Sequence, residues 1–180
     1  MSTMPRAPKY KFGKAKGDLS NQQWMRSGMS TYGSAYLVNN AHENGVRLGV
    51  MKNNKSKRYG CEHAEDVFIR VVKAKVGLLV VSPAVNTIIL SVSKSPCSSS
   101  LGTSNKPVGC AEELINFQNN PYICPITGNE YLFKIIVIAR SVYKQSAGSR
   151  QAITMMRENG IEVTTDVHRK KNGSPMAKEF

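Results

Sequence analysis

The second half of the chain alternates apolar strands with amphipathic helices, and this order limits the fold more than any other feature. Apolar runs predict strands at residues 86–93, 131–143 and 161–167, and helical periodicity predicts helices at 110–117 and 149–159. Parallel strands joined through a helix form right-handed crossover units in one sheet. We therefore expect an α/β fold in which the last two strands run parallel and helices cover the sheet.

The first half adds a hairpin and one further helix to this sheet. Residues 31–39 and 46–51 have the composition of strands, and turn-forming residues 42–45 separate them. The helix after the hairpin has a wide apolar stripe, in which Phe68 and Val72 lie beside Val67, Val71 and Ala74. The sequence leaves open whether residues 76–81 end this helix or form a strand. The prediction is a three-layer α-β-α sandwich around a mixed five-stranded sheet.

The charge balance favours a polyanionic partner. The 180 residues include 25 Lys and Arg against 12 Asp and Glu, which gives a net charge of +13 and a pI near 9.8. Such an excess favours nucleic acid or an anionic membrane surface as the partner. We divide the chain into a basic N-terminal arm at residues 1–25, a folded domain at 26–170 and a polar tail at 171–180.

The sequence predicts a soluble protein without membrane insertion. No apolar run reaches the ~18 residues that a membrane-spanning helix needs. The N-terminus lacks the apolar segment of a signal peptide. Four cysteines allow two disulfides in three pairings. A chain of this length does not need them, and the neighbouring His and Glu residues favour a metal site or catalysis.

Three short segments contain residues suited to metal chemistry. His63 and Glu65 stand at a predicted helix start, Cys97 follows a predicted strand, and Cys110 opens the next helix. One histidine and two cysteines form a good three-ligand zinc set, with a fourth position left for water. Glu65 is two residues beyond His63, so on a helix it points away from the ligand direction. It is therefore the candidate proton carrier rather than a fourth ligand.

The segments His-Ala-Glu at residues 63–65 and Pro-Cys at 96–97, followed by Cys110, resemble the signature of the zinc-dependent cytidine/nucleobase deaminase superfamily. The resemblance spans roughly residues 30–168. It implies a cytidine deaminase-like fold, Zn²⁺ bound by the one histidine and two cysteines, and Glu65 as the catalytic acid and base. The family usually has two residues between its cysteines, whereas this chain has twelve. Cys61 and Cys124 therefore remain alternative ligands.

Within that superfamily, the chain is similar to bacterial toxin-type DNA cytosine deaminase domains. The resemblance implies conversion of cytosine to uracil in a single-stranded or flipped base of DNA. It also implies an immunity protein as partner and action in the cytoplasm of a target cell. Two alternatives stay open: an RNA or tRNA adenosine deaminase, and a nucleic-acid-binding module on the same fold that has no activity.

A basic loop directly before the His-Ala-Glu segment is the strongest candidate for contact with a nucleic acid backbone. It contains Lys55, Lys57 and Arg58. Two tyrosines are candidates for stacking on the base, Tyr59 and Tyr122. The resemblance further suggests that Asn39 or Asn40, at the end of the first strand, contacts the nucleoside sugar.

Overall fold

The computed structural model describes residues 31–39, 42–56, 60–79, 86–139, 141–165, 167–169 and 175–177. Five strands form the main sheet: β1 (Tyr32–Asn39), β2 (His42–Lys52), β5 (Asn86–Val92), β8 (Phe133–Ala139) and β9 (Glu162–Thr164). Within the described residues, three α-helices accompany it: α2 (Ala64–Leu79), α3 (Cys110–Asn119) and α4 (Ala147–Glu158). A short 3₁₀ turn, η1 (Tyr143–Gln145), precedes α4.

Three small two-stranded sheets complete the described part. They pair β3 (Asn54–Ser56) with β4 (Gly60–Glu62), β6 (Tyr122–Ile123) with β7 (Glu130–Tyr131), and β10 (Val167–Arg169) with β11 (Pro175–Ala177).

The main sheet is mixed and has the order β2-β1-β5-β8-β9. β1 pairs antiparallel with both β2 and β5, whereas β5, β8 and β9 run parallel. The α/β class, the mixed five-stranded sheet and the parallel pairing of the last two strands are therefore confirmed. The chain leaves β2 and β5 at the same edge of the sheet, because these two strands point the same way.

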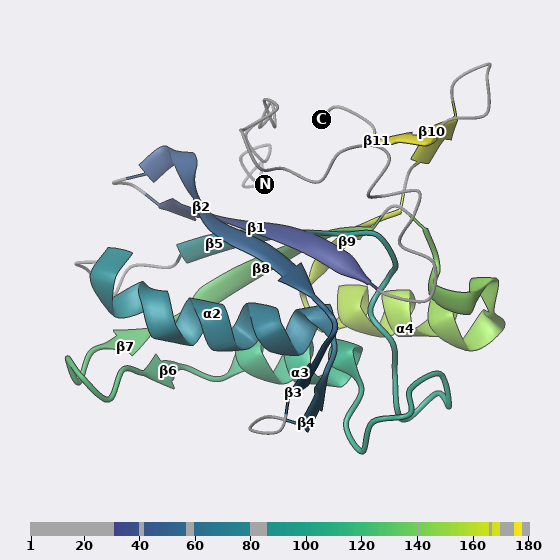
Figure 1. The fold of residues 1–180 in the computed structure, drawn as a ribbon, viewed down its shortest axis with the longest axis horizontal. Coiled ribbons are helices and arrows are strands. Elements are labelled where there is room, and N and C mark those ends of the chain that lie inside the picture. Colours follow the sequence, from purple (N-terminus) through teal and green to yellow (C-terminus); the bar gives the residue numbers. More distant parts are fainter. Residues whose placement is uncertain are drawn as a thin grey trace, which may run out of the picture.

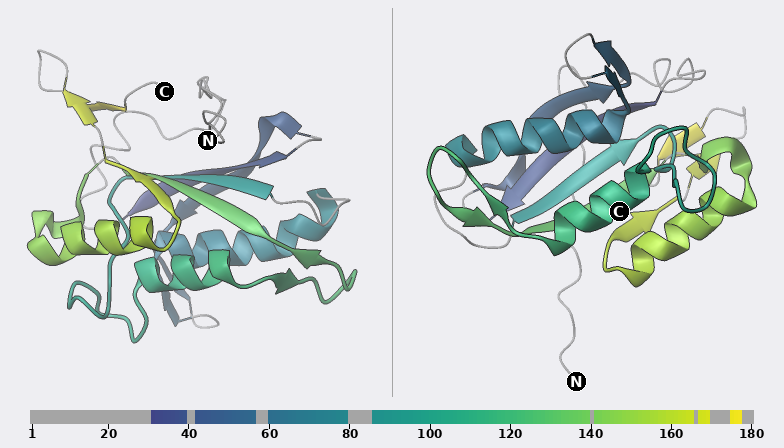
Figure 2. Two further views of the ribbon diagram at one scale, coloured as in Figure 1. Left: turned by 180° about the vertical axis from the view of Figure 1, so that it is seen from behind. Right: turned by 90° about the horizontal axis from the view of Figure 1, so that it is seen from below.

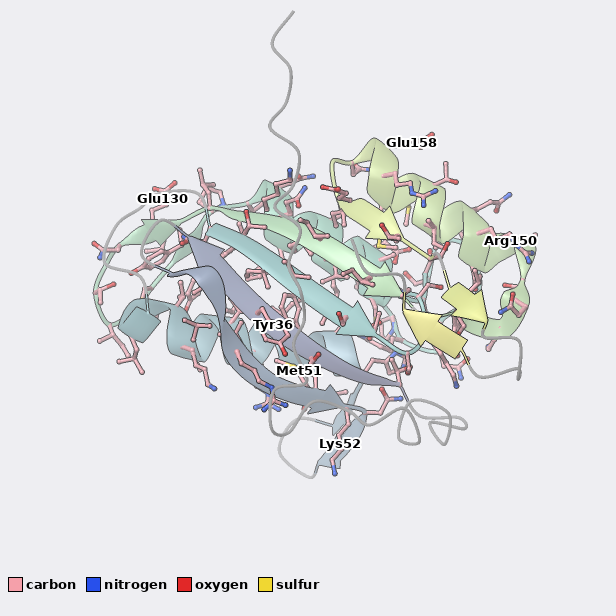
Figure 3. All side chains as sticks on the ribbon, turned by 90° about the horizontal axis from the view of Figure 1, so that it is seen from above. Tyr36, Met51, Lys52, Glu130, Arg150 and Glu158 are labelled. Atoms are coloured by element: carbon pink, nitrogen blue, oxygen red, sulfur yellow. The ribbon has the colours of Figure 1, made fainter. Side chains whose placement is uncertain are left out.

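The three helices lie on one face of the sheet (Figures 1 and 2). Each helix links a strand to a parallel strand further along the same direction of the sheet, and right-handed crossovers then place every helix on the same side. Figure 3 looks onto the opposite face, on which Tyr36 is labelled. No second helical layer covers that face within the residues that the structure describes.

The core lies between this helical layer and the sheet. Helix α2 contributes a buried stripe of Ala64, Phe68, Val72 and Val76. The predicted wide stripe includes the buried Phe68 and Val72, but its members Val67 and Val71 are only partly buried and Ala74 is exposed. Residues 76–79 belong to α2, so the start of segment 76–81, whose assignment the sequence left open, is helix rather than strand. The remainder of that segment from residue 80 lies outside the described residues.

Two predicted boundaries were wrong. Residues 42–45 belong to β2 rather than to a turn, because Asn39 pairs with His42 and the hairpin is correspondingly tight. The apolar run 131–143 is divided between β7 and β8, and it ends at Ala139 before η1. None of the helices in the described part of the chain is long and apolar enough to cross a membrane. The predicted basic arm at 1–25 lies outside the described residues, and the division into arm, domain and tail stays a prediction.

Candidate metal centre

The candidate metal centre lies at the edge of the sheet where the chain leaves β2 and β5. His63 is the residue between β4 and α2, and Cys110 is the first residue of α3. Cys97 follows the end of β5 by five residues. Ligand crevices in α/β sheets lie outside the carboxyl ends of parallel strands, and this site has that position.

The structure brings the three candidate ligands together. Nδ1 of His63 lies 3.5 Å from Sγ of Cys97 and 3.3 Å from Sγ of Cys110. The ligand atoms of all three residues lie within 4.8 Å of one another. Tetrahedral zinc with bonds of about 2.0 Å to nitrogen and about 2.3 Å to sulfur would separate these atom types by about 3.5 Å. The group therefore fits the spacing of a tetrahedral zinc site, and it could hold a metal ion.

The two sulfurs make the site suited to a cation. A hydrogen bond from Cys110, opposed by burial, lowers the pKa of Cys97 to about 4. The same contact and burial raise the pKa of Cys110 above its ordinary value. Two thiolates whose sulfurs lie within 4.8 Å of each other repel, so a cation bound between them would allow both to ionise. The start of α3 assists, because the positive end of a helix dipole favours anions.

Glu65 is buried beside the candidate ligands. Glu65 is only 3% exposed, and burial raises the pKa of its carboxyl group to about 7. The charge of Cys97 raises this pKa further, whereas a hydrogen bond from Cys110 and the charge of His63 lower it. A carboxyl group with a pKa near neutrality can both accept and release a proton at physiological pH.

The start of α2 is capped by two side chains that sequence reasoning missed. Asn53 Oδ1 accepts a hydrogen bond from the Ala64 backbone N–H at 3.0 Å. Asp66 Oδ2 accepts one from the His63 backbone N–H at 2.7 Å. An acid three residues into a helix that binds back to the N-cap amide is half of a capping box, so the spacing from His63 to Asp66 was a usable signal. Both contacts involve backbone amides, so capping of the helix does not use the His63 ring.

The loop of residues 98–109 returns to its starting point. The Ala111 backbone N–H donates to the Cys97 carbonyl at 2.8 Å, which ties the two ends of the loop together. Gly109 lies against the loop start, where an added Cβ would meet the Ser99 nitrogen at 2.3 Å and the Ser98 Cα at 2.6 Å. Only glycine fits this close approach. The twelve-residue spacing therefore does not separate Cys97 from Cys110.

Glu112, in the first turn of α3, holds this loop through a single carboxylate oxygen. Its Oε1 accepts hydrogen bonds from Ser98 Oγ at 2.6 Å, Ser100 N at 2.9 Å, Ser100 Oγ at 2.8 Å and Ser99 Oγ at 3.4 Å. Burial alone would raise the pKa of Glu112, but the hydrogen bonds from Ser98 and Ser100 lower it to about 2. The run of serines in the loop thus has a structural partner.

Lys106, near the end of the same loop, reaches both helices. Its ammonium group forms ion pairs with Asp66 on α2 and with Glu113 on α3. Burial alone would lower the pKa of Lys106, but the surrounding Cys110, Asp66 and Glu113 raise it above the ordinary value. The ammonium group therefore remains charged.

The remaining substrate candidates fall at different places. Lys55 pairs in the backbone with Cys61, in the hairpin that leads directly to His63. Asn39 stands at the end of β1 next to Val38, which pairs with Thr87 near the start of β5, so it lies at the edge of the sheet away from Cys97. This topology does not favour the expected contact between Asn39 and a bound sugar. The other candidates lie outside the described residues: Asn40, Lys57, Arg58 and Tyr59.

Tyr122 and Cys124 are remote from the candidate ligands. Tyr122 follows the far end of α3, and its hydroxyl donates to the Lys73 carbonyl in α2 at 3.2 Å. Stacking of Tyr122 on a base at the metal site was therefore a wrong expectation. Cys124 is buried and its sulfur lies next to Gly77 near the end of α2, so it cannot replace Cys110 as a ligand. The side chain of Cys61, the other alternative, is outside the described part.

Comparisons with known proteins identify the fold. No protein-family profile matches the sequence, and no curated protein matches it. Among solved structures, the chain is similar to the Rib2 deaminase of Aspergillus oryzae, a C-terminal deletion mutant in complex with DARIPP. The TM-score is 0.50 at 12% sequence identity, and the match covers 76% of this chain and 70% of that chain. The chain has the cytidine deaminase-like fold, and its His-Cys-Cys group could hold a metal ion.

Proposed function

We propose that this protein is a zinc-dependent hydrolytic deaminase that converts cytosine to uracil in DNA. One observation supports the proposal above all others: the carboxyl group of Glu65 is buried against a His-Cys-Cys group on a deaminase-like fold. Zinc held by His63, Cys97 and Cys110 would supply a Lewis acid that activates water for attack on a base. Glu65 would take a proton from this water and pass it to the nitrogen of the leaving amine.

Charge supports a polynucleotide as the substrate. The net charge of +13 favours a polyanion, and the hairpin that contains Lys55 leads directly to His63. A base within a duplex cannot reach a site of this kind, so the substrate would be a single-stranded or flipped base. The resemblance to toxin-type domains supports an interbacterial toxin domain with an immunity protein as partner.

One observation favours a second candidate, an RNA or tRNA adenosine deaminase. β8 and β9 run parallel, and this arrangement is associated with the tRNA adenosine deaminase branch of the superfamily.

The test incubates the purified protein with single-stranded and duplex oligonucleotides, in DNA and RNA, that contain a single cytosine or a single adenine. DARIPP, present in the Rib2 deaminase complex, is added as a small-molecule compound to be tested beside the oligonucleotides. We expect uracil in single-stranded DNA, loss of activity with a zinc chelator and recovery with added zinc. Inosine in RNA would move the function to the second candidate. Product from DARIPP alone would overturn the polynucleotide proposal, and no product from any substrate would favour the non-catalytic module.

Contact with the nucleic acid backbone is tested by salt dependence. Neutralising Lys55, Lys57 and Arg58 together should weaken binding and flatten the plot of log K against log salt by up to about 0.7 per lost contact. Neutralising Lys73, Lys75 and Lys134 together, which are all exposed, is the matched control. An unchanged slope in the triple variant would exclude this loop from the interface.

A further inference from the structure

Lys106 directs an N–H group at one of the candidate metal ligands. Its Nζ forms an ion pair with Asp66, lies 2.9 Å from Glu113 Oε2 and lies 3.7 Å from Cys110 Sγ. A lysine ammonium has three N–H donors, and these three acceptors account for all of them. The sulfur contact is within the length of a hydrogen bond to sulfur.

This cluster differs from an ordinary surface ion pair. The Lys106 side chain is 13% exposed and that of Asp66 is 16% exposed. By contrast, Lys134 and Glu162 form a pair at 3.8 Å in which both side chains are about half exposed. Exposed pairs of the second kind contribute little to stability. The Lys106 ammonium is held in one position by acids from two helices, so its distance to the Cys110 sulfur is fixed.

The other sulfur has a partner from the same loop. Ser104 Oγ lies 3.3 Å from Cys97 Sγ, and the Lys106 backbone N–H donates to the same hydroxyl at 3.0 Å. The loop between the two cysteines therefore gives a polar neighbour to each sulfur. The partners differ in charge, because Ser104 is neutral and Lys106 is a cation.

We propose that Lys106 is a positioning residue that limits how much electron density the Cys110 sulfur gives to a bound metal ion. A hydrogen bond from a cation withdraws density from a thiolate, so the metal remains a stronger Lewis acid. Groups that contact metal ligands commonly change metal affinity or activity by about 10–100-fold when they are removed. The inference rests on the zinc centre of the proposed function, but not on the identity of the substrate.

The test replaces zinc by Co²⁺ and records the sulfur-to-cobalt charge-transfer band of the full chain. A hydrogen bond stabilises the sulfur electrons and moves this band to shorter wavelength. Lys106→Met should therefore shift the band to longer wavelength at full cobalt occupancy. Lys106→Arg, which keeps the charge, should remain near the wild-type position. Lys134→Met is the matched control, because it removes a lysine from an exposed ion pair, and it should leave the band unchanged.

The outcomes separate this inference from the proposed function. Band position needs only metal binding, so a shift in Lys106→Met supports the role of Lys106 even if no deaminase substrate is found. If turnover is measured, kcat of the zinc form should fall about 10–100-fold with KM unchanged. A band of Lys106→Met that coincides with the wild-type band would overturn the inference, whatever happens to activity. Absence of any such band in the wild type would overturn both the metal centre and the inference.

Discussion

The two helix starts that carry the candidate ligands are constructed in different ways. At the start of α2, His63 follows directly from β4, and its backbone is fixed by Asn53 and Asp66. At the start of α3, Cys110 follows a twelve-residue loop whose position depends on side chains of Glu112 and Lys106. The first start is secured by capping of the backbone. The second is secured by charged groups that hold a long loop.

This difference shows that a candidate ligand can be positioned by capping of the helix backbone or by charged side chains that hold a loop. At the start of α2, two different side chains share the capping, so the loss of either leaves the other in place. At the start of α3, several hydrogen bonds end on one carboxylate of Glu112, so one substitution affects all of them. We therefore expect the α3 start to be the more sensitive one in both stability and pH dependence.

Loss of the α3 ligand should have the largest effect. Cys110→Ser should reduce bound zinc from about one equivalent to near zero and should lower thermal stability, because metal ligation joins the two helix starts. Metal analysis after gel filtration in reducing buffer measures this. Cys124→Ser, which changes a buried cysteine away from the centre, should keep its zinc. Full zinc retention in Cys110→Ser would remove Cys110 from the ligand set.

Loss of the α2 carboxyl group should separate activity from metal binding. Glu65→Ala keeps all three ligands, so zinc content should be unchanged while kcat falls at least 10²–10⁴-fold, the contribution of a general acid and base. Steady-state kinetics with metal analysis test this, with the exposed Glu158→Ala as control.

In bacteria that express the protein, Glu65→Ala should also relieve growth arrest and abolish C-to-T mutations. Near wild-type turnover in this variant would contradict the mechanism. Toxicity that persists in the variant, without mutations in either form, would instead favour the binding module.

The carboxylate that holds the loop should matter for stability. Glu112→Gln should lower the free energy of unfolding by about 2 kcal/mol at pH 7, since the hydrogen bonds would be accepted by a neutral amide oxygen instead of a charged carboxylate. The folded pKa of about 2 lies below the ordinary value of 4.5, so this contribution is present above about pH 4.5 and is lost as the pH falls towards 2. Urea unfolding of both proteins from pH 7 to pH 3 should show their difference shrinking with acid. A constant difference would mean that the charge of Glu112 is not responsible.

The cap of α2 should give the smallest effect. Asn53→Ala removes one acceptor of a helix N–H, and the expected loss is about 1 kcal/mol. Urea unfolding measures it against Asn105→Ala, an exposed loop residue. If Asn53→Ala proved more costly than Glu112→Gln, the comparison of the two helix starts would be reversed.

The parts of the site that depend on short-range pattern were predictable. His63, Cys97 and Cys110 were found because each stands at a helix start or after a strand, where α/β folds gather side chains. Their binding of metal and the role of Glu65 stay predictions. Parallel β8 and β9 followed from the strand–helix–strand order.

The parts that depend on distant contacts were not predictable. Lys106 and Asp66 are forty residues apart, and no periodicity connects them. The family resemblance suggests that Asn39 contacts a bound sugar, but the antiparallel register of β1 against β5 puts Asn39 at the end of the sheet away from Cys97. A single sequence contains the order of the elements, but it does not contain which strand ends lie together in the folded sheet.

The hydrogen bond between the Ala111 amide and the Cys97 carbonyl has a consequence for how such a chain can change over time. A loop whose two ends are joined by a hydrogen bond can lengthen without displacing the elements that precede and follow it. Growth from two residues to twelve costs only about 1.6 kcal/mol in closure entropy. The hydrogen bonds accepted by Glu112 are sufficient to offset a cost of that size. Insertions and deletions in this loop are therefore a route by which related chains can acquire different loops around the candidate metal centre while the positions of the candidate ligands stay the same.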